Sequence, residues 1–205
     1  MSEKRSLVLR HFRKVDSVIY EALKGINFKE RSLLKKRASS DYLAALCREV
    51  INQQLSDKVA RVIVARFDKT FGLKVKPRGL LGTSDKKLRA LGISNAKVSY
   101  IKNIGRAFLQ KPKHFSRLHK LPDEEVVTKL TSIKGVGPWT AEMFLIFTLG
   151  REDVFSYGDL GLRKAFANLY GVKNPKERDL EKVVSRWSPF KSYGAMALWR
   201  SVDNA

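Results

Sequence analysis

The chain has 205 residues, of which 43% are hydrophobic and 30% charged. That hydrophobic content is too high for a disordered chain and suffices for a core in one large domain or two small lobes. Forty-one Lys and Arg against 20 Asp and Glu give a net charge of +21, which favours polyanions as partners. Charge alone does not separate DNA from RNA or from an anionic membrane, and a merely lysine-rich surface gives the same count.

The composition also excludes several kinds of site. A single cysteine, Cys47, rules out an intramolecular disulfide and a cysteine-ligated iron–sulfur cluster, and its apolar surroundings predict an inert core thiol. The three histidines of the chain, His11, His114 and His119, have no partners at metal-ligand spacing, so we expect no zinc or iron site. No apolar run approaches the roughly 20 residues of a membrane span, and the charged N-terminus is unlike a secretory signal. We expect an intracellular protein without membrane association.

Apolar residues at helical spacing predict helices along nearly the whole chain. A first helix is expected over 8–23, and Asp41 is expected to cap a second that carries Cys47. Further helices are predicted over 57–71, 84–90, 95–110, 123–130, 140–149, 160–170, 176–187 and 192–202. Residues 74–78 are expected to form a basic loop and 112–122 a connector. With no convincing strand and no internal repeat, the class is all-α, and the size suits two helical lobes with a cleft between them.

The segment 130–142 (LTSIKGVGPWTAE) is the most informative stretch. Gly135 and Gly137 flank Val136 and allow a tight turn between two helices. Such a turn points backbone N–H groups outward at the start of a helix that Thr140 or a neighbour caps, and unpaired amides there bind phosphate. Together with Lys134, the residues Gly135, Val136, Gly137 and Thr140 predict a helix-hairpin-helix that binds a nucleic-acid backbone.

Asp159 follows the hairpin in the sequence, directly before Leu160. By itself it is most simply an N-cap, because such caps greatly outnumber catalytic aspartates. The hairpin followed by this carboxylate resembles the helix-hairpin-helix DNA glycosylase superfamily, in particular its alkylpurine branch of 3-methyladenine DNA glycosylase II type. Three further stretches carry the resemblance, which spans about residues 40 to 200: 49–56 (EVINQQLS), 88–94 (LRALGIS) with Lys97 and Tyr100, and 187–195 (WSPFKSYGA) with Trp199.

The resemblance implies a two-lobed helix-hairpin-helix glycosylase fold with the active-site cleft between the lobes and no N-terminal β domain. Residues 1–205 would form a single compact unit, with a hairpin-bearing lobe over approximately 42–151 and a second lobe from 1–41 plus 152–205. The implied activity is hydrolysis of the N-glycosidic bond of alkylated purines, such as 3-methyladenine and 7-methylguanine, in double-stranded DNA after base flipping. Asp159 would be the catalytic residue that stabilises the oxocarbenium-like sugar and orients water.

Trp139 occupies the position at which strand-cutting members carry a Schiff-base lysine, so the resemblance predicts a monofunctional enzyme that leaves an abasic site. An electron-rich aromatic pocket attracts a cationic alkylated base. The implied pocket residues are Trp139, Trp199, Met143, Tyr157 and Phe155. The alternative for any tryptophan is a core position, which we prefer for Trp187. Met143 stands where some relatives place a tyrosine, which leaves the base preference open.

Base flipping needs a wedge that fills the gap in the duplex. The resemblance assigns the wedge to the segment Gln53, Gln54, Leu55 and Ser56. Gln54 would be the wedge itself, and Gln53 would contact the neighbouring bases. As an alternative, the two glutamines merely cap or link helices. The resemblance further implies a structural Na⁺ or K⁺ at the carbonyls of Thr131, Ile133 and Val136, and no organic cofactor.

We expect a monomer bound to DNA with alkylated bases, because a lesion has no two-fold symmetry for a dimer to match. The location would be with DNA, in the cytoplasm and nucleoid or in a nucleus. Three alternatives remain: a glycosylase for oxidised or mismatched bases, a non-catalytic damage-binding module, and an RNA-binding protein. The missing lysine and cysteine cluster argue against the first, Asp159 against the second, and the lack of RNA-binding motifs against the third.

Overall fold

The computed structural model describes residues 3–26, 34, 36–72 and 74–203, so residues 1–2 of the N-terminal segment lie outside it. The described residues form α-helices and short 3-10 helices with no strand, as predicted. The contacts divide the chain into two compact units. We call Lys36–Leu149 the hairpin unit, and Met1–Lys35 with Gly150–Ala205 the terminal unit.

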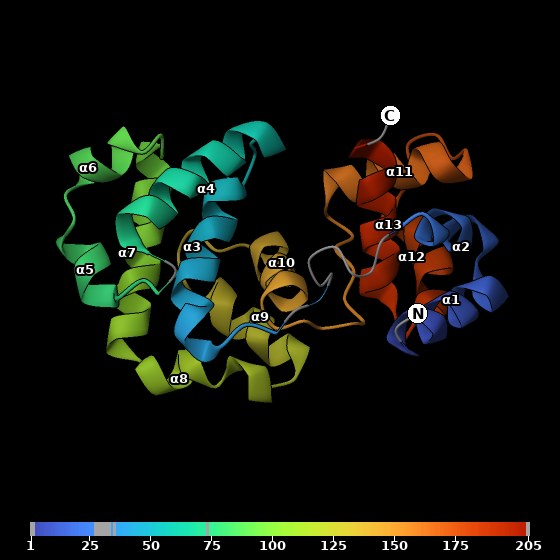
Figure 1. Ribbon diagram of the computed structural model, residues 1–205, viewed down its shortest axis with the longest axis horizontal. Coiled ribbons are helices and arrows are strands. Elements are labelled where there is room, and N and C mark those ends of the chain that lie inside the picture. The colour runs from blue at the N-terminus through green and yellow to red at the C-terminus, as the bar shows by residue number, and fades with distance from the viewer. Residues whose placement is uncertain (1–2, 27–33, 35, 73, 204–205) are drawn as a thin grey trace. The chain divides into compact units, whose positions relative to one another are not determined.

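The hairpin unit is built around α3, which packs against α4, α7 and α10 (Figure 1). Most of α3 and α10 is buried, whereas the other helices bury one face, so these two helices form the centre of the core. Helix α9 packs against α10, and α5 packs against α7. The helices are α3 (Tyr42–Asn52), α4 (Asp57–Phe71), α5 (Pro77–Gly82), α6 (Asp85–Ala90), α7 (Asn95–Gln110), α8 (Pro112–Ser116), α9 (Asp123–Thr131) and α10 (Pro138–Phe147), with 3-10 turns at Ser39–Asp41 and Leu118–Lys120.

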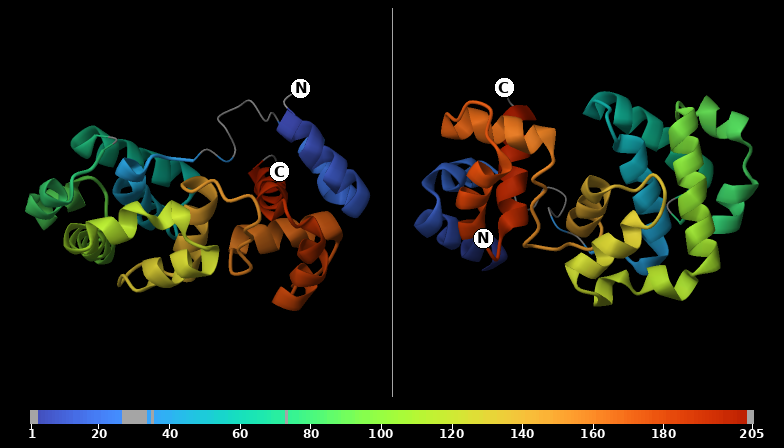
Figure 2. Two further views of the ribbon diagram at one scale, coloured as in Figure 1. Left: turned by 90° about the horizontal axis from the view of Figure 1, so that it is seen from below. Right: turned by 180° about the vertical axis from the view of Figure 1, so that it is seen from behind.

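The terminal unit is centred on α13, which packs against both α11 and α2 (Figure 2). Trp187 is fully buried in this core, as predicted, and its ring lies so close to Gly194 that a Cβ there would overlap it. Its helices are α1 (Glu3–Val15), α2 (Ser17–Lys24), α11 (Leu160–Tyr170), α12 (Glu177–Val184) and α13 (Lys191–Asp203), with a 3-10 turn at Ser185–Trp187.

The prediction of one helix over 8–23 is wrong, because Asp16 separates α1 from α2. Its backbone is extended (φ −160°, ψ 101°), and its Oδ1 accepts hydrogen bonds from the N–H groups of Val18 and Ile19, both at 3.1 Å. Its other oxygen, Oδ2, accepts from the Tyr170 hydroxyl at 2.6 Å and the Trp187 indole N–H at 2.8 Å. A polar group so deeply buried needs these partners, and the helix break provides them.

Other boundaries differ from prediction for local reasons. Pro77 begins α5 instead of lying in a loop, because its fixed φ and missing N–H suit the first helical position. The predicted connector 112–122 contains α8 in the same way, since Pro112 opens that helix. Asp41 makes no side-chain capping bond, and a 3-10 turn leads into α3 instead. Helices α7 and α11 have the predicted bounds.

Candidate active site

The hairpin consists of α9, a turn over 132–137, and α10. The Ile133 N–H bonds the Leu130 carbonyl at 3.1 Å, and the Val136 N–H bonds the Ile133 carbonyl at 2.9 Å, which closes the turn. Gly135 has φ +101°, and a Cβ on it would overlap the Tyr100 ring. A glycine is therefore required there for two reasons, its conformation and the close approach of α7.

Gly137 differs from Gly135, because its φ is −93° and no atom would lie within 4 Å of an added Cβ. Only Gly135 of the two therefore uses the conformational freedom of a glycine. Thr140 is not a cap either: α10 begins at Pro138, and no side chain caps it. Among the described residues, the backbone N–H groups of Gly135, Gly137 and Thr140 donate no backbone hydrogen bond, so they are available to an anion.

The side chain of Gln53 holds the end of α3 against this hairpin. Its amide nitrogen lies 2.7 Å from Thr140 Oγ1 and 3.3 Å from the Gly135 carbonyl oxygen. This geometry matches the alternative in which Gln53 links helices, since its donor group is occupied within the protein. A second link comes from α7, where the Asn103 amide donates to the Lys134 carbonyl at 3.1 Å. Lys134 itself is exposed, whereas the Val136 side chain is buried.

Gln54 lies in the tight turn between α3 and α4, where it and Ser56 are exposed. Its φ is +56°, a left-handed conformation that non-glycine residues seldom adopt. Leu55 is half-buried, with its N–H bonded to the Asn52 carbonyl at 3.3 Å, and Ser56 precedes α4 without a side-chain capping bond. Of the four residues 53–56, Gln54 is therefore the one that combines exposure with a left-handed backbone.

Asp159, in the terminal unit, is buried to 7% exposure and is the N-cap of α11. Its Oδ1 accepts hydrogen bonds from the Leu162 N–H at 2.8 Å and the Trp199 indole N–H at 3.3 Å. Gly161 permits this arrangement, since its Cβ would lie 3.1 Å from Asp159 Oδ1 and 3.5 Å from Trp199 Cδ1. The carboxylate is thus held in one orientation by α11 and α13, beside an aromatic ring.

The aromatic candidates differ in exposure. Trp139, Tyr157 and Trp199 are half-buried and keep accessible ring surface, whereas Met143 and Phe155 are buried. Phe155 packs against Tyr157 and Trp187, with ring centroids 5.0 Å and 5.7 Å apart, and so belongs to the core of the terminal unit. Burial, with smaller effects from nearby carboxylates, raises the pKa of Tyr157, so its hydroxyl is neutral at physiological pH.

Helix α3 also carries a buried thiol, that of Cys47, and a half-buried carboxyl group, that of Glu49. Burial raises the pKa of the Cys47 thiol to about 12, as expected for an inert core cysteine. Burial also raises the pKa of Glu49 to about 7, although the nearby Arg37 and Arg48 and a hydrogen bond with Asn52 oppose this shift. Sequence analysis missed the pKa shift of Glu49 because a half-buried glutamate on a helix has no pattern of its own.

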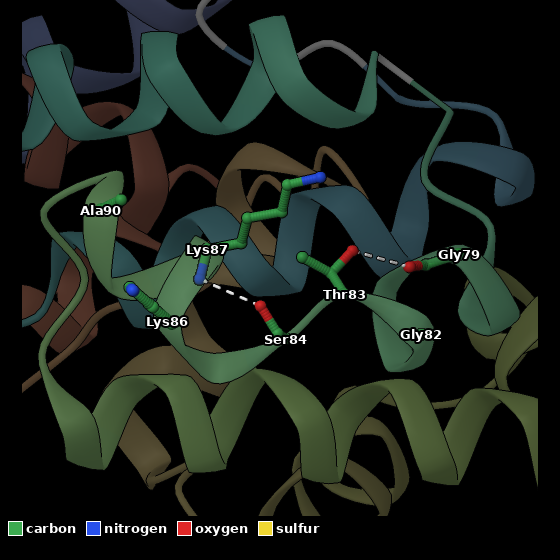
Figure 3. Close-up of a pocket in the computed structure, with 7 residues that line it drawn as sticks. All are labelled: Gly79, Gly82, Thr83, Ser84, Lys86, Lys87 and Ala90. Carbon is green, nitrogen blue, oxygen red and sulfur yellow. Dashed lines mark hydrogen bonds between the residues drawn. The ribbon is translucent and has the colours of Figure 1, made fainter.

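A hollow in the hairpin unit lies away from the predicted site residues. It lies between α5 and α6, where the Thr83 hydroxyl donates to the Gly79 carbonyl at 2.9 Å and Ser84 Oγ caps α6 by accepting from the Lys87 N–H at 3.3 Å (Figure 3). Its lining residues are Gly79, Gly82, Thr83, Ser84, Lys86, Lys87 and Ala90. Because both hydroxyls serve their own helix ends, we assign no part of the active site to it.

In the part of the chain that the structure describes, no three His, Cys, Asp or Glu side chains gather as a metal site would require. Among the same residues, no helix has both the length and the apolar character needed to cross a membrane.

Comparison with known proteins agrees with this geometry. Residues 47–189 match the model of the HhH-GPD superfamily of base excision DNA repair proteins, a span that includes the α3–α4 turn, the hairpin and Asp159. The chain belongs to this superfamily. This HhH-GPD protein is 33% identical to DNA-3-methyladenine glycosylase 1 of Schizosaccharomyces pombe, over 83% of the chain and 75% of the relative. It is 28% identical to the DNA-3-methyladenine glycosylase of Saccharomyces cerevisiae, over 97% and 80%.

Coverage of the relatives differs. The chain spans 56% of the length of a Bacillus subtilis relative to which it is 31% identical. Among solved structures, the S. pombe 3-methyladenine DNA glycosylase in complex with abasic DNA matches with a TM-score of 0.83 at 27% identity, over 95% of each chain. A Bacillus halodurans DNA-3-methyladenine glycosidase matches with a TM-score of 0.74 at 29% identity, over 98% of this HhH-GPD protein and 89% of that chain. The helical glycosylase fold is therefore confirmed.

Proposed function

We propose that this HhH-GPD protein is a monofunctional DNA glycosylase that hydrolyses the N-glycosidic bond of alkylated purines, of the 3-methyladenine and 7-methylguanine type, in duplex DNA. The observation that carries the proposal is the buried Asp159 carboxylate, oriented on Oδ1 by the Leu162 N–H and the Trp199 indole. The names of the relatives support the substrate class, and the S. pombe complex with abasic DNA supports the product.

The chemistry follows from the residues. As the base leaves C1′, the sugar develops positive charge, and a fixed carboxylate stabilises this charge. The same carboxylate can orient the attacking water. An alkylated purine is cationic and leaves readily, so no strong general acid is needed. Trp139 has no amine to attack C1′, so no Schiff base forms, the DNA strand stays intact, and an abasic site remains.

The base pocket is assigned to aromatic rings. Trp139, Tyr157 and Trp199 keep accessible ring surface, which stabilises a cationic base through cation–π contact. Met143 lies four residues after Trp139 on α10 and therefore shares its face of that helix. Phe155 would support the pocket indirectly, by packing against the Tyr157 ring.

DNA binding is assigned to the hairpin and the α3–α4 turn. The free N–H groups of Gly135, Gly137 and Thr140 would hold a phosphate with the exposed Lys134 beside them, and Gln54 would enter the gap left by the flipped base. A structural Na⁺ or K⁺ is proposed at the carbonyls of Thr131, Ile133 and Val136, since such oxygens can replace the hydration shell of a monovalent ion. Among the described residues, the carbonyls of Thr131 and Val136 accept no backbone hydrogen bond, whereas that of Ile133 accepts one from the Val136 N–H. We propose no organic cofactor, a monomer, and a location with cellular DNA.

The test is release of bases from methylated duplex DNA by the wild type and by Asp159→Asn. The asparagine keeps an acceptor for the Leu162 N–H, so the fold should survive. We expect methylpurine release without strand cutting in the wild type, loss of release in Asp159→Asn, and DNA binding that stays intact or tightens. Asp179→Asn serves as the matched control, because Asp179 also bonds a helix-terminal N–H, that of Lys176 at 2.9 Å, in the same unit.

Three results would count against the proposal. Undiminished release by Asp159→Asn would remove its catalytic role. Parallel loss of binding and of thermal stability would reduce Asp159 to a structural cap. No release from wild-type protein that still binds duplex would favour a damage-binding module or a glycosylase for other damaged bases.

A further inference from the structure

Lys97, in the first turn of α7, reaches across to the end of α3. Its Nζ lies 2.8 Å from the Ile51 carbonyl oxygen and 2.5 Å from the Gln53 carbonyl oxygen. The last carbonyls of a helix have no partner within the helix and carry the negative end of its dipole, so an ammonium group there is favourable. Both donor contacts are charge-assisted, which makes them stronger than bonds between neutral groups. The half-buried Lys97 therefore anchors the chain where α3 ends.

The residue directly after this anchor is Gln54, whose left-handed backbone is strained. A non-glycine residue in that conformation is sterically disfavoured and persists only where its surroundings hold it. On one side Gln53 is held twice, through its carbonyl by Lys97 and through its side-chain amide by Thr140 and Gly135. On the other side the Leu55 N–H bonds the Asn52 carbonyl. Contacts from α7 and the hairpin thus hold the turn around Gln54, in addition to the local Leu55–Asn52 bond.

We propose that Lys97 is a positioning residue for the wedge. By binding the Ile51 and Gln53 carbonyls, it keeps the turn in the shape that presents Gln54 to the duplex. Gln53 then joins this turn to the hairpin, so the wedge and the phosphate-binding turn form one rigid element. This inference rests on the proposed function, because a preformed wedge matters only to a protein that turns a base out of the stack.

The physical benefit is preorganisation. Extruding a base costs free energy, and an already ordered wedge offsets that cost without losing conformational entropy on binding. Removing the ammonium should therefore reduce flipping most where the lesion is well paired. Where the lesion is already unpaired, little extrusion energy is needed and the loss should be small. A lysine that served only the fold would affect both substrates equally.

The experiment compares Lys97→Met, Gln54→Ala and the double variant with the wild type, in the full chain and under single-turnover conditions. The substrates carry 7-methylguanine either paired with cytosine or opposite an abasic-site analogue. Lys102→Met is the matched control, because Lys102 lies on the same helix with its Nζ 2.6 Å from Asp85 and does not contact α3 through that bond. Lys97→Arg keeps the positive charge and tests rescue if Lys97→Met folds poorly.

We expect Lys97→Met to slow excision from the paired site about tenfold, as suits the loss of hydrogen bonds to a charged group, and to slow the unpaired site much less. Adding Gln54→Ala should cause little further loss, since both changes remove the same wedge. Lys102→Met should behave as the wild type, and Lys97→Arg should recover part of the rate. Equal slowing of both substrates, or full additivity in the double variant, would overturn the proposal.

A second measurement does not depend on catalysis. 2-Aminopurine placed beside a tetrahydrofuran abasic site brightens when a side chain enters the gap and unstacks it. We expect the increase on binding to shrink in Lys97→Met and Gln54→Ala but not in Lys102→Met. An undiminished signal in Lys97→Met refutes the positioning role, whether or not the wild type releases methylpurines. The salt dependence of binding should be unchanged in Lys97→Met, because a phosphate contact would instead lower its slope by about 1.

Discussion

Replacing Asp16 with alanine should destabilise the terminal unit strongly, because this one carboxylate satisfies four donors. Loss of its bonds to Val18 and Ile19 removes the N-cap of α2, which costs ~1 kcal/mol. Loss of Oδ2 leaves the Tyr170 hydroxyl and the Trp187 indole N–H without an acceptor, at about 1–2 kcal/mol each. We therefore expect Asp16→Ala to lower the free energy of unfolding by about 3–5 kcal/mol, a large share of a typical domain's stability.

Asp16→Asn should cost less, about 1–3 kcal/mol, because an amide can still cap α2 and can donate to the Tyr170 oxygen but leaves the indole unsatisfied. Urea unfolding followed by circular dichroism measures both values. Asp41→Ala is the control, because Asp41 also precedes a helix but makes no capping bond, and should cost under about 0.5 kcal/mol. Tyr170→Phe should be less costly in the Asp16→Ala background than alone. A cost of Asp16→Ala below about 1 kcal/mol, or strict additivity with Tyr170→Phe, would refute the reasoning.

Two further predictions concern the hairpin unit. Gly135→Ala should lower the free energy of unfolding by about 2–4 kcal/mol and weaken duplex binding, since φ is +101° and the added methyl overlaps the Tyr100 ring. The control Gly137→Ala should change the free energy of unfolding by no more than about 0.5 kcal/mol in the same assay. Equal effects of the two variants would contradict the conclusion that only position 135 needs a glycine. Because burial raises the pKa of Glu49 from 4.5 to about 7, the folded state retains a proton that the unfolded chain releases, so this residue reduces stability as pH rises from about 4.5 to 7. The stability of Glu49→Gln relative to wild type should therefore increase across that window and level off above it, by about 2–3 kcal/mol in urea titrations, whereas exposed Glu181→Gln should show no such trend.

Much of the secondary structure was predictable because its signals are local. Helix α7 begins where Ser94 Oγ accepts from the Lys97 N–H, and α11 ends at Gly171 in a left-handed conformation, both of which leave marks within one turn of the chain. The break at Asp16 was not predictable in this way. An aspartate within an apolar helical pattern becomes a cap only because Tyr170 and Trp187, more than 150 residues away, require its second oxygen.

The same division applies to the site. The amino-acid sequence determines the hairpin turn, the aspartate that begins α11 and the absence of a lysine at Trp139, because each depends on residue types at short, fixed spacing. Only the tertiary structure assigns Gln53 to the hairpin, places Lys97 on the carbonyls around Gln54, and brings Gly161 close to Asp159 and Trp199. These contacts join side chains that are distant along the chain, and no local propensity specifies which of them meet. Packing of α3, α7 and α10 in one unit, and of α11 and α13 in the other, decides them.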